Sequence, residues 1–143
     1  MCKKYFFVII SFCFVLFVKT AISQENPEII TERFFEIYQE QSTDDAVDYV
    51  FATNKWLNSD RTVQENIKIQ LKKGIAMIGQ FYGYELIEKK VLSESYVMLN
   101  YMLKYDRQPI KFTFILYKPN TIWQIQNLKF DDRLEDDIES MKK

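Results

Sequence analysis

The chain has 143 residues, 48% of them hydrophobic and 16% aromatic, and it carries 19 basic and 20 acidic side chains. This slightly acidic balance argues against nucleic acid or an anionic membrane as the main partner. The chain has no histidine and only two cysteines, which excludes histidine-based catalysis and leaves little material for a zinc site. Nucleophile motifs, glycine-rich phosphate loops and metal-ligand spacings are absent from the sequence, so we expect no catalytic motif, no cofactor and no metal.

Residues 1–23 have the organisation of a secretory signal peptide. A short basic region is followed by a largely apolar run over residues 5–18 and by small residues that end at Ser23. We predict cleavage between Ser23 and Gln24, and export to the periplasm or the outside of the cell. An uncleaved anchor is the alternative, because two polar residues separate the apolar run from the cleavage motif.

The predicted mature part, residues 24–143, is expected to form a single domain. Both cysteines lie in residues 1–23, so cleavage removes them and the exported domain has no disulfide to stabilise it. It also becomes more acidic, because three lysines leave with the signal. The domain must therefore be stabilised by its hydrophobic core alone.

The first half of this domain has the periodicity of helices. Asn26 is expected to cap the first helix, whose apolar stripe is Ile30, Phe34, Ile37 and Tyr38. The second starts with a capping sequence at Ser42 and buries Ala46, Val47, Val50 and Phe51. We expect Trp56, which follows it, to close the base of the core.

The third predicted helix is the longest. Ser59 or Asp60 caps it, and Gly79 ends it. Its expected buried stripe is Val63, Ile67, Leu71, Ile75 and Ile78. Its expected solvent side carries Lys68, Lys72 and Lys73.

After Gly79 the hydrophobic period changes from that of a helix to two, which predicts strands. The strands are expected at residues 84–91, 96–105, 110–117 and 122–130, and a short acidic helix at residues 132–141. Short connections between consecutive strands indicate an antiparallel meander. Three helices followed by such a meander predict an α+β fold, with the helices on one face of the sheet.

The region from Gly79 to Asp132 resembles small uncharacterised exported proteins of Bacteroidetes-type bacteria. The resemblance is carried by residues 78–84, 101–106, 112–119 and 123–127. The order of elements also resembles the cystatin-like or nuclear-transport-factor-2-like (SnoaL-like) cone. The resemblance implies a curved sheet wrapped by helices, and it implies no particular activity, since that cone serves enzymes, ligand binders and partner-binding modules.

The strands place apolar side chains on both faces of the predicted sheet. One layer of helices covers only one face, and an open apolar patch usually marks an interface. We therefore predict a homodimer through the other face, although the terminal helix or sheet curvature is an alternative cover. The expected interface residues are Met98, Met102, Ile115, Tyr117 and Trp123.

Tyrosines and a few basic residues are the candidates for ligand contact. A pocket between helices and sheet would use tyrosine hydroxyls to orient a small apolar ligand. The candidates are Tyr82, Tyr101, Tyr105, Arg107 and Lys111. For tyrosines in strands, ordinary packing is the competing interpretation.

The sequence does not decide whether the chain is an enzyme, and it favours a non-enzymatic role. The predicted function is an exported binding or assembly module that holds a small apolar ligand or a protein partner. The alternative is an acid–base enzyme of the cone fold, isomerase-like or dehydratase-like, with a carboxylate beside a tyrosine. Its acid would be Glu85, Glu88 or Asp106, buried near Tyr101 or Tyr105.

Overall fold

The structure, a computed structural model, describes residues 26–141, and the predicted signal peptide lies outside the described residues. Within them, four helices precede a four-stranded antiparallel sheet, and one short helix follows it. The fold class is therefore α+β, as predicted. The elements in chain order are α1 (Glu28–Glu40), α2 (Thr43–Ala52), α3 (Lys55–Asn58), α4 (Arg61–Ile78), β1 (Phe81–Ser93), β2 (Tyr96–Tyr105), β3 (Ile110–Tyr117), β4 (Gln124–Asp131) and α5 (Leu134–Ser140).

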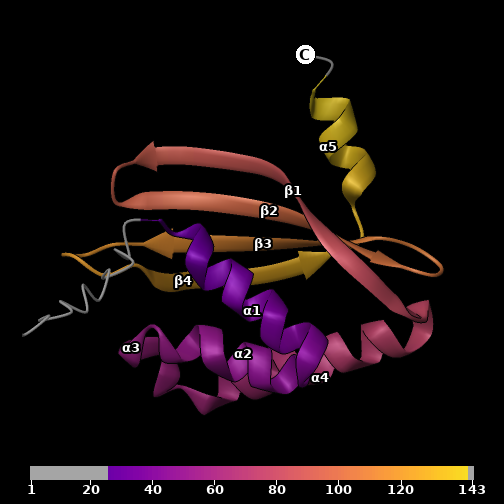
Figure 1. The fold of residues 1–143 in the computed structure, drawn as a ribbon, viewed down its shortest axis with the longest axis horizontal. Coiled ribbons are helices and arrows are strands. Elements are labelled where there is room, and N and C mark those ends of the chain that lie inside the picture. The colour runs from indigo at the N-terminus through magenta and orange to yellow at the C-terminus, as the bar shows by residue number, and fades with distance from the viewer. Residues whose placement is uncertain (1–25, 142–143) are drawn as a thin grey trace, which may run out of the picture.

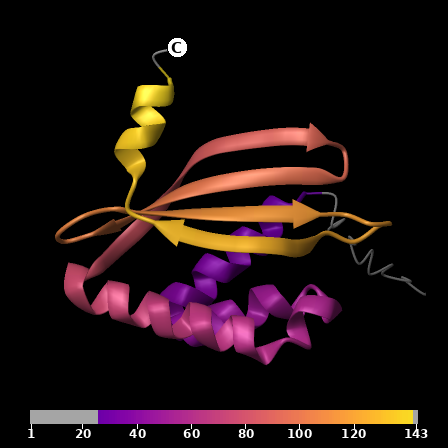
Figure 2. The same cartoon turned by 180° about the vertical axis from the view of Figure 1, so that it is seen from behind.

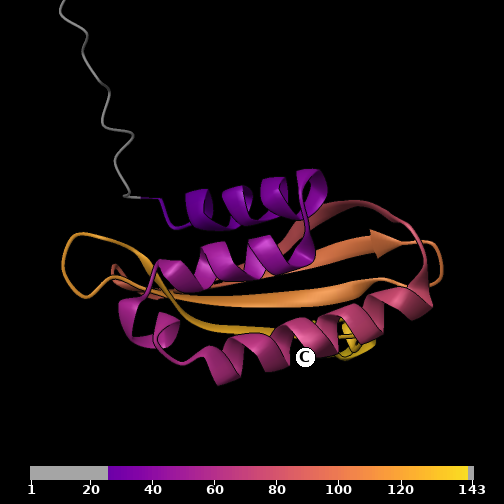
Figure 3. The ribbon, with the colours of Figure 1, turned by 90° about the horizontal axis from the view of Figure 1, so that it is seen from below.

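The helices α1, α2 and α4 lie side by side across one face of the sheet (Figures 1 and 3). The helix α5 leaves the end of β4 and points away from this layer (Figure 2). The strands pair in chain order, so β2 and β3 are central while β1 and β4 form the two edges. We call the face under α1, α2 and α4 the helix-side face, and the opposite one the outer face.

The predicted caps stabilise the starts of the helices. The Asn26 side chain accepts a hydrogen bond from the Glu28 N–H at 3.0 Å, although Pro27 occupies the N-cap position. Ser42 accepts from the Asp45 N–H, also at 3.0 Å. Asp60 accepts from the Thr62 N–H at 3.1 Å and thereby caps α4.

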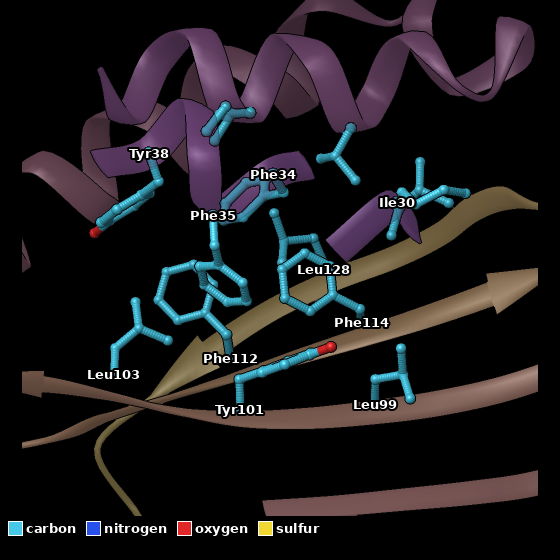
Figure 4. Packing of buried hydrophobic residues seen from close by; sticks show 14 of the residues in the cluster. Ile30, Phe34, Phe35, Tyr38, Leu99, Tyr101, Leu103, Phe112, Phe114 and Leu128 are labelled. Carbon is cyan, nitrogen blue, oxygen red and sulfur yellow. The ribbon is translucent and has the colours of Figure 1, made fainter. Parts of the chain in front are cut away.

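Aromatic rings fill the space between α1 and the sheet. Phe34 and Phe35 are completely buried, and the ring of Phe34 lies edge-on to that of Phe114, with centroids 5.1 Å apart. Figure 4 shows these α1 rings pointing at Phe112 and Phe114 on β3. The predicted stripes of α1 and α2 are all buried, as expected.

The face that α4 buries differs from the predicted one. Leu71 and Ile78 are buried as expected, but Val63 is exposed and Ile67 and Ile75 are only partly covered. Gln64 and Lys68 take their places in the core-facing row. The prediction that Lys68 lies in solvent is wrong, and the reason is an ion pair described below.

Two regions at the element boundaries also differ from expectation. β1 begins at Phe81 rather than at residue 84, because Gly83, with φ of 134°, lets the strand bulge and continue toward α4. Trp56 does not close the core. It lies in the unpredicted short helix α3 with 73% of its surface exposed, and the Lys55 ammonium sits 4.9 Å from the centre of its ring.

Candidate functional site

The space where a cone-shaped enzyme would hold its substrate is filled by side chains. The helix-side face of β2 and β3 presents residues that are completely buried against α1. They interlock with the α1 rings in Figure 4. The residues of this filling are Phe34, Phe35, Leu99, Leu103, Phe112 and Phe114.

Tyr101 and Tyr105, two of the predicted ligand residues, lie within this filling. The Tyr101 hydroxyl is 2.7 Å from the Thr31 hydroxyl on α1, and the Tyr105 hydroxyl makes a short hydrogen bond with that of Tyr38. Burial raises the pKa of Tyr101 to about 12 and also raises the pKa of Tyr38 and Tyr105. Both hydroxyls therefore serve to join α1 to β2.

Tyr82 and Asp106 form a tyrosine–carboxylate pair, but they do so on the surface. The Tyr82 hydroxyl donates to Asp106 Oδ1 at 2.5 Å, and the Gln80 N–H donates to Oδ2 at 2.9 Å. These bonds lower the pKa of Asp106 below its usual value. Arg107, the next residue, donates to the Met77 carbonyl at 2.8 Å. The cluster fastens the turn after β2 to the junction of α4 and β1.

The outer face of the sheet carries a polar row across three strands. Asn100 on β2 is buried, and its amide donates to Glu88 on β1 at 2.8 Å while its carbonyl oxygen accepts from Thr113 on β3 at 2.7 Å. Beside this row, Lys104 forms an ion pair with Glu85 at 2.8 Å. Glu85 and Glu88 thus face away from Tyr101 and Tyr105, on the opposite side of the sheet.

The helix α5 covers part of this outer face. Lys111, a predicted ligand residue, donates to Asp137 of α5 at 3.0 Å and lies 3.7 Å from Asp131. A depression of about 40 Å³ separates α5 from Glu88 and Asn100, which is room for one or two water molecules. The five predicted ligand residues are therefore spread over the interior, the rim and the outer face, and do not meet in one pocket.

The predicted interface residues are also divided between two faces. Met98 and Ile115 are neighbours on the outer face, where Tyr117 pairs with Tyr96 and Met102 pairs with Lys111. Trp123 does not belong to this patch. It is only 3% exposed, and it borders a depression on the helix side together with Ile30 and Tyr49. Polar residues interrupt the remaining patch, so the outer face is less apolar than predicted.

A buried lysine forms an ion pair between α2 and α4 that the sequence pattern did not indicate, although its acidic partners are partly exposed. Lys68 is 7% exposed, and its ammonium lies 2.7 Å from Asp48 Oδ1 and 3.1 Å from Glu65 Oε1. Burial would lower the pKa of Lys68, but these bonds raise it above the ordinary value. An acidic residue on the preceding helix was the available signal, but the sequence does not show which helix faces are in contact.

A groove runs between α4 and the edge strand β4. One section, of about 350 Å³, lies between α4 and the C-terminal half of β4, and its lining is both apolar and charged: Ile67, Gln70, Leu128, Lys129, Phe130, Asp131 and Arg133. The next section, of about 230 Å³, shares Phe130 and continues along Gly74 and Met77, with Ile110 and Asp132 among its walls. Sequence reasoning did not anticipate it, because the strand and helix that form it are far apart in the chain.

Comparison of the chain with protein-family models, curated protein sequences and solved structures gave no match. Over residues 26–141, no helix combines the length and apolar character needed to cross a membrane. The same residues contain no group of three or more acidic, histidine or cysteine side chains that could hold a metal ion.

Proposed function

We propose that the chain is an exported binding or assembly module that acts through its surface. The observation that carries this proposal is the filling of the helix–sheet interior by aromatic and leucine side chains, with the hydroxyls of Tyr101 and Tyr105 already bonded to Thr31 and Tyr38. A small apolar ligand would need space that these side chains occupy. A protein partner needs only surface, and is therefore the favoured occupant.

The fold proposal is that this chain is a variant of the nuclear-transport-factor-2-like or cystatin-like cone. It is supported by helices preceding a four-stranded antiparallel meander and by a first helix that packs across the central strands. The cone serves many activities, so the fold does not choose among them.

The alternative acid–base enzyme requires a carboxylate in apolar surroundings within reach of a tyrosine. The tyrosine–carboxylate pair described above, Tyr82 with Asp106, lies on the rim, where Tyr82 is 60% exposed and the pKa of Asp106 is lowered rather than raised. A general acid or base working near neutral pH needs the opposite shift. This geometry favours the binding module over the enzyme.

The proposal is tested with benzene, a probe that enters dry apolar cavities. The purified chain should show no saturable change in the NMR signals of Phe112 and Phe114 when benzene is added. Leu99→Ala and Phe34→Ala serve as controls, because each opens a cavity in the same place and should bind the probe. Saturable binding to the unchanged chain at those residues would reject a filled interior and restore the pocket-based functions.

A further inference from the structure

The two edges of the sheet differ in how well they are protected against the addition of another strand. β1 and β4 are the edge strands, and an edge presents unpaired backbone groups to which another strand can add. β1 departs from regular pairing at three places, between Phe81 and Gly83, Leu86 and Glu88, and Val91 and Ser93. Bulges and lysines, here Lys89 and Lys90, are devices that discourage strand addition. β1 is therefore a protected edge.

β4 is protected only where it begins. The N–H of Ile125 donates to the Thr53 hydroxyl at 2.9 Å, and its carbonyl accepts from the Asn54 amide at 2.7 Å. One irregularity follows, at Gln126, and from Asn127 to Asp131 the strand pairs with β3 residue by residue. Among the described residues, no strand lies on the other side of this regular stretch.

The groove beside β4 places both apolar and charged side chains next to this open edge. Leu128 and Phe130 lie on the helix-side face of β4 and line the groove together with residues of α4. Gly74 in the middle of α4 lines the same groove, and a Cβ placed there would meet no atom within 4 Å. Glycine inside a helix normally costs stability, and here no neighbouring group in the described chain requires it.

When two copies of β4 pair antiparallel, one register places opposite charges against each other. Lys129 and Asp131 lie on the outer face, on either side of Phe130. If two copies of β4 pair antiparallel about a two-fold axis at Phe130, each Lys129 lies opposite the other copy's Asp131. An axis at Lys129 or at Asp131 places like charges opposite each other. An axis at Leu128 would include Gln126, the irregular residue of β4, in the paired stretch.

We propose that the chain forms a homodimer by antiparallel pairing of β4 with β4 of a second copy, centred on Phe130. The two sheets then join into one of eight strands, and the Phe130 side chains meet over the joined grooves. This dimer replaces the predicted contact through the outer face. The dimer proposal rests on the proposed function, in which the chain acts through its surface rather than through its interior.

The first test is the molar mass of the exported chain measured by light scattering over a range of concentrations. The unchanged chain should be dimeric. Lys129→Glu should raise the dimer dissociation constant about tenfold or more, because it places two like-charge pairs across the axis. Combining it with Asp131→Lys should restore the dimer. Lys90→Glu on β1 is the matched control and should leave the dimer unchanged.

The second test uses the absence of cysteine from residues 24–143. Phe130→Cys should form an interchain disulfide on mild oxidation, since residues directly opposite in an antiparallel pair have Cα atoms about 4.5–5.5 Å apart. Lys129→Cys should not form a disulfide, because the two copies of residue 129 are not directly opposite in this register. They are diagonal neighbours, about 7–8 Å apart. Circular dichroism confirms that each variant is folded before its mass is compared.

A monomeric unchanged chain would overturn the proposal, and so would a dimer that ignores both Lys129→Glu and the charge exchange. Dissociation by Lys90→Glu alone would assign the interface to β1 and equally reject it. None of these outcomes affects the benzene experiment, which examines the interior. Failure of the dimer and failure of the proposed function are therefore distinguishable.

Discussion

At Gly79 the chain passes from α4 into β1 with a φ of 91°. A Cβ at this position would lie 2.7 Å from the Asp106 carboxylate and 2.8 Å from the Asp106 Cβ. Both the backbone conformation and the contact therefore require glycine. The Asp106 turn can bond to Gln80 and Tyr82 only because nothing projects from residue 79.

Gly79→Ala should lower the free energy of unfolding by about 1–3 kcal/mol, because it strains the backbone and displaces Asp106. Gly74→Ala is the matched control, since that glycine lies inside α4 with open space around it. It should raise the free energy of unfolding by about 0.5–1 kcal/mol. Urea denaturation at a fixed protein concentration measures both. Equal effects at the two sites would contradict this account of Gly79.

The buried tyrosines make stability depend on alkaline pH. Tyrosine ionises near pH 10 in an unfolded chain, whereas burial raises the pKa of Tyr101 to about 12 and raises that of Tyr38 as well. A raised folded-state pKa contributes stability that is complete below about pH 10 and is lost as the pH rises through the folded-state value.

We therefore expect unfolding to begin above about pH 10 and to coincide with ionisation of these tyrosines. Ultraviolet absorbance of tyrosinate and far-ultraviolet circular dichroism, recorded on the same samples, should change together. Tyr101→Phe removes one ionising group and should weaken the pH dependence in this range. Ionisation of every tyrosine near its ordinary pKa in a chain that remains folded would contradict the burial.

At the scale of elements, consecutive residues of β3 lie on opposite faces of the sheet. Phe114 is completely buried against α1, while Ile115 lies partly buried on the outer face. Phe114→Ala should cost about 3–5 kcal/mol of unfolding free energy, and Ile115→Ala about 1 kcal/mol or less. Thermal or urea unfolding compares the two, and a larger loss at Ile115 would mean that the helices cover the other face.

The sequence predicted the two central strands well and the buried face of α4 less well. The bounds of β2 and β3 match the prediction, because alternation along a central strand directly reflects burial. The stripe of α4 was wrong at Val63 and Lys68, since a charged side chain paired across helices can be buried while an apolar one is exposed. Hydrophobic periodicity alone does not show which charged side chains are paired across helices and buried.

The candidate site was less predictable than the fold. Tyr101 and Tyr105 were identified from residue type, but their partners Thr31 and Tyr38 lie on α1, far away in the sequence. Without those contacts, a hydroxyl that is free for a ligand cannot be told from one that is already bonded. Trp123 was assigned to the wrong face because it precedes β4, where strand alternation does not apply.

At the scale of the whole molecule, the proposal of export makes a prediction about the N-terminus. Mass spectrometry of the protein recovered from the periplasm or the medium should give a chain that starts at Gln24, because the small residues end at Ser23. Replacing Ala21 and Ser23 with large residues should block this cleavage and leave a longer chain. An exported protein that keeps Met1 would contradict the prediction.

The hydroxyl pairs between α1 and β2 join segments that are far apart in the sequence, which affects when during synthesis the fold can form. Thr31 and Tyr101 are 70 positions apart in sequence, and Tyr38 and Tyr105 are 67 apart. The helix α1 contacts α2, but Phe34 and Tyr38 of its apolar stripe also pack against β3 and β2, so the N-terminal helices alone lack part of the contacts that stabilise them. If the chain is exported as proposed, we expect it to remain unfolded until its second half has left the secretion channel, because the core is incomplete without β2 and β3.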